Sequence, residues 1–197
     1  MNFLDRFDRE EARDILLGFF VLFVALSVWW YVLNRNAPLW LVGVLGASIS
    51  LTAFLGHEMM HRYVARRLGG ISRFKLWPVG ALIALISAPL GFVFAAPGAV
   101  YFSGIFDNER IGKVGYAGPL WNLVVGTVLY SIYLLLGKGL IAYIIGSVGA
   151  LNLWFCLFNM IPVWMFDGAK IWRWNKEIYI ITVAVAILLN VATGFVL

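Results

Sequence analysis

The chain has 197 residues, of which 62% are hydrophobic and 13% charged, with a formal net charge of +5. Soluble domains are about 45–50% apolar and about 25% charged, so this composition excludes an ordinary soluble protein and predicts a polytopic membrane protein. The cations are spread over short connectors, which fits topology signals on a cytoplasmic face better than a nucleic-acid-binding surface. The single cysteine, Cys156, lies in an apolar run, so we expect neither an internal disulfide nor a cysteine-rich zinc site.

Apolar runs that suit a bilayer begin after a charged N-terminal segment. Residues 1–14 alternate acids and bases among large apolar side chains, and we expect an interfacial segment there. A spanning helix needs roughly 20 predominantly apolar residues. Such spans are expected, in chain order, at 15–33, 39–63, 114–136, 139–164 and 178–197.

The connector after the second span contains the densest group of cations in the chain, namely Arg62, Arg66, Arg67, Arg73 and Lys75. The positive-inside rule places this end of the second span on the cytoplasmic side. The first span then runs outward from a cytoplasmic N-terminus.

Both histidines of the chain lie near that cytoplasmic end, in the stretch Gly56-His57-Glu58-Met59-Met60-His61. Positions i and i+4 share one face of a helix, so both imidazoles can bind one metal ion. Glu58 follows the first histidine and can take a proton from a water molecule at that ion. The pattern predicts one half of a metal-hydrolase site.

A zinc hydrolase needs a third protein ligand and leaves a fourth position for water. Carboxylates are the candidates, because no further histidine exists. Asp107 and Glu109 lie in a charged connector, where acids are ordinary. Asp167 instead follows an apolar span that Pro162 interrupts, and an acid beside the hydrocarbon region indicates function. Asp167 is the favoured ligand, and a turn aspartate facing water is the alternative.

Residues 76–104 are apolar but interrupted by prolines and glycines, namely Pro78, Pro89, Pro97, Gly80, Gly91 and Gly98. They can either cross the membrane once or dip into it and return, provided that the backbone groups are paired. A single crossing would deliver Asp167 to the outer face, away from His57 and His61. A re-entrant hairpin returns Asp167 to their side, and the cations that follow Asp167 also favour it. We therefore expect an all-α protein with five transmembrane helices, six being the alternative, and a re-entrant β-hairpin-like segment at 76–104.

Two motifs in this order resemble the site-2 protease family of intramembrane zinc metalloproteases. They are HExxH at residues 57–61 and NxxPxxxxDG at residues 159–168. The stretches Ala117-Gly118-Pro119-Leu120-x-Asn122 and Ala96-Pro97-Gly98-Ala99-Val100 are similar to other segments of that family. The resemblance covers most of the chain, and the ordered pair of motifs on two apolar spans makes it specific.

The resemblance implies that His57, His61 and Asp167 bind one Zn²⁺ per chain. It also implies that Glu58 acts as the general acid and base. Asn159 matches a family asparagine that supports the substrate or its oxyanion, with a hydrogen bond between helices as the alternative.

For Asn122 we favour a structural hydrogen bond between helices, next to a role in substrate support. The family's proline-glycine segment resembles a membrane-associated β-hairpin, which supports the re-entrant path of residues 76–104. The chain is interpreted as a single domain, 1–197, without a soluble regulatory domain.

The family resemblance implies a hydrolase of the cell membrane that cleaves peptide bonds in or near transmembrane segments, as in regulated intramembrane proteolysis. Its active site would lie towards the cytoplasm, and its partners would be a transmembrane protein substrate and the lipid bilayer, with no nucleic acid. A membrane metal-ion transporter and an inactive protease-like scaffold are the alternatives. The pattern specifies neither an oligomeric state nor a particular substrate.

Overall fold

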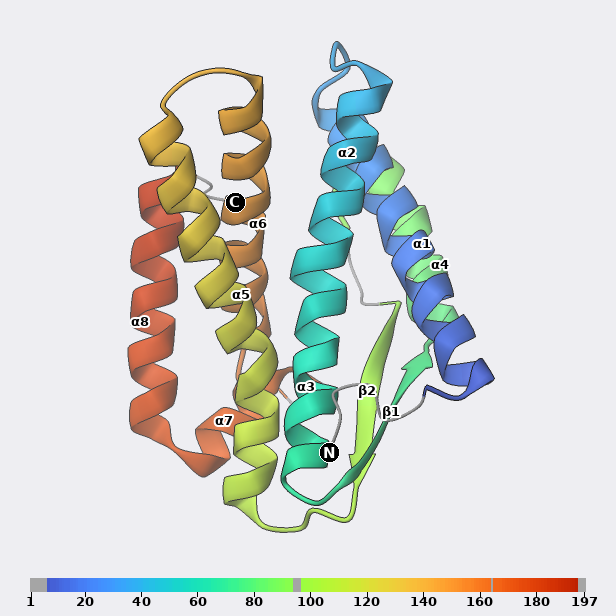
Figure 1. Cartoon of the computed structure of the whole chain (residues 1–197), viewed down its shortest axis with the longest axis vertical. Helices are drawn as coiled ribbons and strands as arrows, with labels where there is room; N and C mark the ends of the chain where they lie inside the picture. Colours follow the sequence, from blue (N-terminus) through green and yellow to red (C-terminus); the bar gives the residue numbers. More distant parts are fainter. Residues whose placement is uncertain (1–6, 94–96, 164, 195–197) are drawn as a thin grey trace.

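Within residues 7–93, 97–163 and 165–194, which the computed structural model describes, five helices are long and apolar enough to cross a membrane (Figure 1). This confirms the prediction of a mostly helical, polytopic membrane protein. The five are α1 (Arg9–Leu33), the continuous helix Leu39–Arg67, α5 (Asn108–Leu136), α6 (Leu140–Asn159) and α8 (Lys176–Thr193). The continuous helix comprises α2 (Leu39–Ile49), the π-helical segment η1 (Ser50–Leu55) and α3 (Gly56–Arg67).

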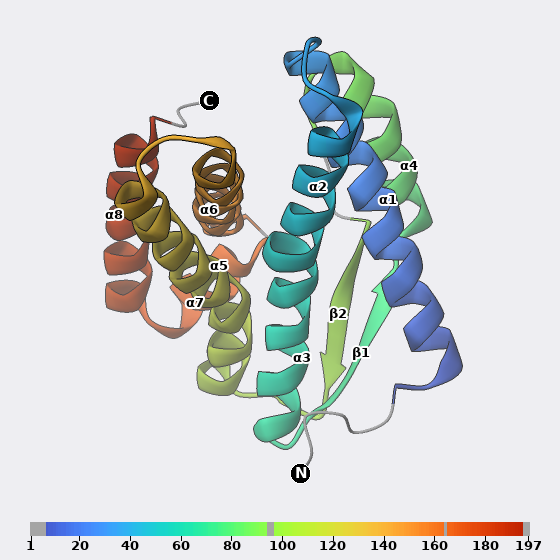
Figure 2. The same cartoon turned by 45° about the horizontal axis from the view of Figure 1, so that its top comes forward.

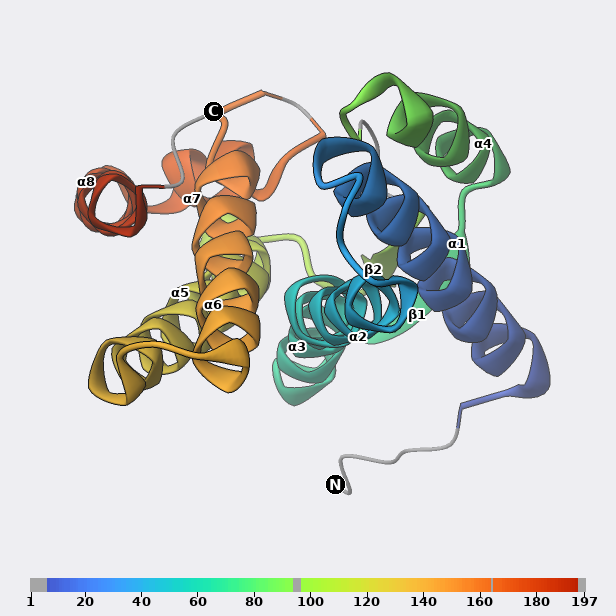
Figure 3. The same cartoon turned by 90° about the horizontal axis from the view of Figure 1, so that it is seen from above.

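The helices form two groups that meet along α3 and α5. Figures 2 and 3 show α1 to α4 on one side, and α5, α6, α8 and the short helix α7 (Asp167–Trp174) on the other. Helix α5 packs against α3, α6 and α7. Both α3 and α7 therefore contact α5.

The segment between α3 and α5 leads away from the end of α3 and returns beside its own start, as predicted for a re-entrant hairpin. Its boundaries and its secondary structure differ from the prediction. Strands β1 (Ile71–Leu76) and β2 (Gly98–Ser103) pair antiparallel, from Ile71 opposite Ser103 to Leu76 opposite Gly98. The connection between them contains α4 (Pro78–Ser87) and the 3-10 turn η2 (Ala88–Leu90), which pack against α1 (Figure 1).

Two physical reasons explain why the segment contains a helix and why its strand begins earlier than predicted. The run from Pro78 is almost wholly apolar, and a helix pairs its own backbone groups where water is scarce. Strand β1 begins at Ile71, before the predicted start at residue 76, because the cations Arg73 and Lys75 alternate with the buried Ser72 and Phe74. That alternation is a strand pattern, and the positive charges hide it among topology signals.

The predicted interfacial segment, residues 1–14, is not a separate helix where it is described. Residues 9–14 form the first turns of α1, and residues 1–6 lie outside the described part of the chain. The acids of these turns bind β1 instead of facing headgroups alone. Glu11 Oε1 accepts from the backbone N–H of Phe74 at 3.0 Å, and Asp14 Oδ2 accepts from that of Leu76 at 3.2 Å.

Glu11 also forms a buried ion pair with Arg62 of α3, in which Nε donates to Oε1 at 2.9 Å. Replacing Glu11 by Ala is expected to lower the free energy of unfolding by about 3–5 kcal/mol, because the buried guanidinium loses its carboxylate partner. The control is Glu10→Ala, since the Glu10 side chain is 75% exposed in its pair with Arg73 and should cost less than about 1 kcal/mol. Unfolding in mixed micelles by SDS titration measures both, and equal losses would contradict the prediction.

The π-helical segment η1 directly precedes the HExxH turn. Side chains of α5 donate to its carbonyl oxygens: Trp121 Nε1 to Thr52 at 2.8 Å, and Asn122 Nδ2 to Ala53 at 2.9 Å. A π-helical turn changes the rotation of the helix that follows it, and such turns occur frequently at functional sites. Here it sets the direction in which α3 presents its histidines.

Candidate metal centre

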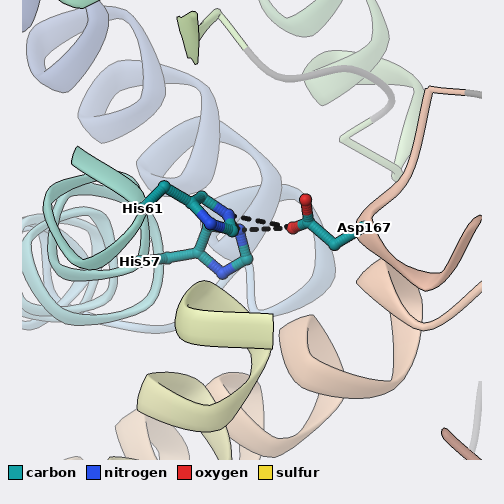
Figure 4. A group of neighbouring side chains, drawn as sticks. All are labelled: His57, His61 and Asp167. Atoms are coloured by element: carbon teal, nitrogen blue, oxygen red, sulfur yellow. Dashed lines mark hydrogen bonds and ion pairs between the residues drawn. The ribbon is translucent and has the colours of Figure 1, made fainter. Parts of the chain in front are cut away.

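Three side chains converge between α3 and α7 (Figure 4). The Nε2 atoms of His57 and His61 lie 2.9 Å apart. Asp167 Oδ2 lies 3.0 Å from His61 Nε2 and 3.2 Å from His57 Nε2. All three residues are buried. The structure thus brings together the residues predicted as ligands, although Asp167 is 106 positions after His61.

The other nitrogen of each imidazole faces an oxygen. His57 Nδ1 bonds to Asn122 Oδ1 at 2.5 Å, and His61 Nδ1 bonds to the carbonyl oxygen of Val114 at 2.7 Å. Because both partners are acceptors, each Nδ1 carries the proton and each Nε2 presents a lone pair. Two lone pairs and the Asp167 carboxylate therefore point at one another, an arrangement that requires a cation between them.

The spacing of these atoms fits zinc. A tetrahedral ion with bonds of about 2.0–2.1 Å to nitrogen and oxygen has ligand atoms about 3.3 Å apart, close to the observed 2.9–3.2 Å. Two histidines and one carboxylate are also a donor set of catalytic zinc sites, which keep one further position open. His57, His61 and Asp167 would hold the ion.

Glu58 lies beside this group without belonging to it. Its side chain is buried, and Oε2 accepts from the backbone N–H of Val100 on β2 at 2.7 Å. That bond joins the predicted general base to the re-entrant sheet. It also shows that the N–H of Val100 points away from β1, so this edge of β2 faces the site.

Helix α5 approaches the metal ligands so closely that only glycine fits. A Cβ atom at Gly118 would lie 2.6 Å from His57 Nε2 and closer still to His61 Nε2. A Cβ atom at Gly168 would lie 2.7 Å from the carbonyl oxygen of Ile161 and closer still to that of Met160. The first glycine brings α5 against the imidazoles, and the second brings the start of α7 against the end of α6.

Lys170 is a site residue that the sequence presented only as one of several cytoplasmic cations. Its Nζ donates to Asp167 Oδ1 at 2.8 Å. Burial raises the pKa of Asp167, but the Lys170 ammonium group is among the charges that hold it well below its ordinary value. Burial lowers the pKa of Lys170, but Asp167 raises it above its ordinary value. The acid three positions before a base, on one helix, is the signal that could have identified this pair.

The two asparagines occupy different positions. Asn159 is the last residue of α6, and its Nδ2 donates to Phe155 of the same helix at 3.0 Å. Its proposed contact with substrate stays a prediction. Asn122 donates across helices to Ala53 and to Asn152 Oδ1, and it also binds His57, which was not expected.

Replacing Asn122 by Ala is expected to weaken zinc binding by about 10–100-fold, because His57 loses the acceptor that fixes its tautomer and ring orientation. Competition with a chromophoric chelator measures the affinity. The control is Asn190→Ala, which removes another buried asparagine, one that bonds to Leu153 and Ala186. Equal zinc affinities of wild type and Asn122→Ala would contradict the prediction.

The fold and the site together define a multi-pass membrane protein with a zinc centre of hydrolase type. The protein named "Putative zinc metalloprotease MJ0611" of Methanocaldococcus jannaschii is 32% identical over 179 residues, which cover 89% of this chain and 90% of that protein. "Zinc metalloprotease MJ0392" of the same organism is 26% identical over 156 residues, covering 78% of this chain and 40% of that protein.

"Putative zinc metalloprotease Rip3" of Mycobacterium tuberculosis is 29% identical over 146 residues, covering 70% of this chain and 33% of that protein. No family model and no solved structure matches the chain. The similarity to MJ0611 over nearly the whole length of both proteins shows the family: the chain belongs to the site-2 protease family of zinc metalloproteases.

Proposed function

We propose that this zinc metalloprotease hydrolyses peptide bonds in or near transmembrane segments of membrane-protein substrates, in regulated intramembrane proteolysis. The observation that carries the proposal is the position of the centre. His57, Glu58 and His61 are buried within the membrane-spanning helix Leu39–Arg67, and Asp167 follows another span. A substrate segment in the same bilayer reaches this centre without crossing an interface.

Zinc, when bound, would polarise the scissile carbonyl and lower the pKa of a water molecule towards about 7. Glu58 takes a proton from that water and passes it to the leaving amine. Its Oε2 is held by Val100, so Oε1 remains for the proton. Asn159 would support the substrate or its oxyanion. For this, Asn159 Nδ2 must release the carbonyl oxygen of Phe155 and donate to the substrate instead.

The sheet supplies a place for an extended substrate. Phe74 and Val100 are opposite each other, and both backbone N–H groups bond to side chains outside the sheet. The backbone of Val100 is therefore directed away from β1. Its N–H is held by Glu58, and its carbonyl oxygen lies on the edge that a further strand can pair with. A transmembrane segment must unwind locally to use this edge, since a helix keeps its carbonyl groups in its own hydrogen bonds.

We also propose a cytoplasmic active site in the cell membrane. The start of α1, the end of α3, the sheet and α7 all lie at one end of the molecule (Figure 1). The cations of these elements are Arg9, Arg13, Arg62, Arg66, Arg67, Arg73, Lys75, Lys170 and Arg173. The positive-inside rule supports the cytoplasmic assignment, with the N-terminus on the same side.

The transporter alternative calls for ligands along a path through the membrane. Among the described residues, His57, His61 and Asp167 form the one cluster of three or more histidine, cysteine or acidic side chains that could hold a metal ion. The scaffold alternative calls for a disabled base, whereas Glu58 is present and buried beside the ligands. Both observations favour the protease.

The test is cleavage in proteoliposomes of a single-span model substrate whose apolar segment contains a helix-breaking Gly-Pro pair. Mass spectrometry of the products is expected to locate the cut in or next to the apolar segment, and zinc chelation should stop it. A matched substrate with a polyleucine segment should be cut more slowly, because its helix resists unwinding. Cleavage confined to a distant soluble loop, or none by zinc-loaded protein, would contradict the proposal.

A further inference from the structure

The two oxygens of the Asp167 carboxylate have different partners. Oδ2 faces the Nε2 atoms of His57 and His61, as the dashed lines in Figure 4 show, while Oδ1 points away from them. Oδ1 accepts from Lys170 Nζ at 2.8 Å. The ammonium group thus occupies the oxygen that the histidines do not face.

The lysine is held in this position by its own helix and by α5. Asp167 and Lys170 are three positions apart on α7 and therefore share one face of the helix. The aliphatic part of Lys170 lies against Gly115, where a Cβ atom would be 2.9 Å from Lys170 Cβ and 3.0 Å from Lys170 Cδ. With its carbons against the α5 backbone, the side chain delivers its charge to the carboxylate.

The consequence concerns how many oxygens Asp167 can offer to a metal. Carboxylates bind cations through one oxygen or through both. A catalytic zinc site has three protein ligand atoms and an open position, which a second carboxylate oxygen would fill. An ammonium group bound to Oδ1 withholds that oxygen and also offsets part of the negative charge of the ligand.

We propose that Lys170 is a positioning residue of the metal centre, which limits Asp167 to one coordinating oxygen and thereby keeps a coordination position free. The inference rests on the zinc centre and not on the proposed substrate. In this role Lys170 differs from the other cations of the same end of the molecule, because the charge of Lys170 acts on a metal ligand and not on lipid headgroups. It also predicts that the charge and the hydrogen bond matter more than the length of the side chain.

The experiment replaces zinc by Co²⁺ in purified full-length protein and records the visible absorption spectrum. The variants are Lys170→Met, which keeps the carbons and removes the ammonium group, and Lys170→Arg, which keeps a charged donor. Arg173→Met is the matched control, because Arg173 is an exposed cation of the same helix. Wild type should show the strong absorption of four-coordinate Co²⁺. Lys170→Met should lose much of that intensity as a second oxygen of Asp167 binds.

Lys170→Arg and Arg173→Met should keep the wild-type spectrum. The kcat of cleavage by the zinc form should fall about 10–100-fold in Lys170→Met, with KM unchanged. A wild-type spectrum in Lys170→Met, loss of its cobalt altogether, or a Lys170→Arg spectrum like that of Lys170→Met would each overturn the inference. Failure of wild type to cleave any membrane substrate would overturn the proposed function alone, because the spectra do not depend on cleavage.

Discussion

Glu58→Gln is expected to abolish detectable proteolysis while the protein still binds one zinc ion. General acid and base catalysis contributes about 10²–10⁴-fold to the rate, and glutamine cannot take up the proton. The substitution keeps the size of the side chain, and its amide oxygen can still accept from the N–H of Val100. Zinc should stay, because the three ligand atoms come from His57, His61 and Asp167.

The control is Glu109→Gln, because Glu109 is an exposed acid near the start of α5, where it pairs with Lys113. This variant should cleave at the wild-type rate. Zinc content by elemental analysis and cleavage of the model substrate are measured on the same preparations. Normal cleavage by Glu58→Gln would show that another group moves the proton.

Gly118→Ala is expected to remove zinc binding, although it adds one methyl group and improves helix propensity. The new carbon would lie 2.6 Å from His57 Nε2 and closer to His61 Nε2, so it would collide with both ligand atoms. Neither imidazole can withdraw freely, because Asn122 and Val114 hold the Nδ1 atoms. We expect zinc affinity to fall by more than the roughly 10–100-fold that a lost supporting contact costs.

Gly43→Ala is the matched control for this substitution. Gly43 lies in the same spanning helix as the histidines, and a Cβ atom there would meet nothing within 4 Å. It should bind zinc normally and gain up to about 1 kcal/mol of helix stability. Equal zinc affinity in Gly118→Ala and Gly43→Ala would mean that α5 lies farther from the imidazoles than the structure shows.

The metal ligands could be predicted from the sequence because very few alternatives exist. The chain has two histidines, and their spacing of four places them on one helix face. The third ligand, Asp167, was favoured because it follows an apolar span that Pro162 interrupts, and it was then required to share the histidines' side of the membrane. The same requirement predicted that the segment between α3 and α5 returns, and the paired strands β1 and β2 agree with it.

The interior of that segment could not be predicted in the same way. The run from Pro78 to Leu90 is apolar on all sides, so it has no periodicity that separates a buried strand from a helix. The strand of residues 71–76 was obscured because two of the positions that alternate with its buried residues are the cations Arg73 and Lys75, and cations also serve as topology signals. Only the partners of the strand, Glu11 and Asp14 of α1, distinguish the two roles.

The contacts that support the metal centre also could not be predicted from sequence patterns. The π-helical turn η1 has no glycine or proline that marks it, and it depends on hydrogen bonds from Trp121 and Asn122 of a helix far along the chain. Gly118 is one of 20 glycines, and only the position of α5 shows that its missing side chain is required. Tertiary packing, and not local sequence, determines these features.

The central claim is that His57, His61 and Asp167 form one zinc centre that cleaves membrane substrates. Zinc content and cleavage of the model transmembrane substrate, measured on wild type beside Asp167→Ala, test it most directly. Wild type should contain one zinc ion per chain and cleave the substrate, and Asp167→Ala should lose both. An Asp167→Ala protein that retains its zinc and its activity would contradict the claim, because the centre would then need another third ligand.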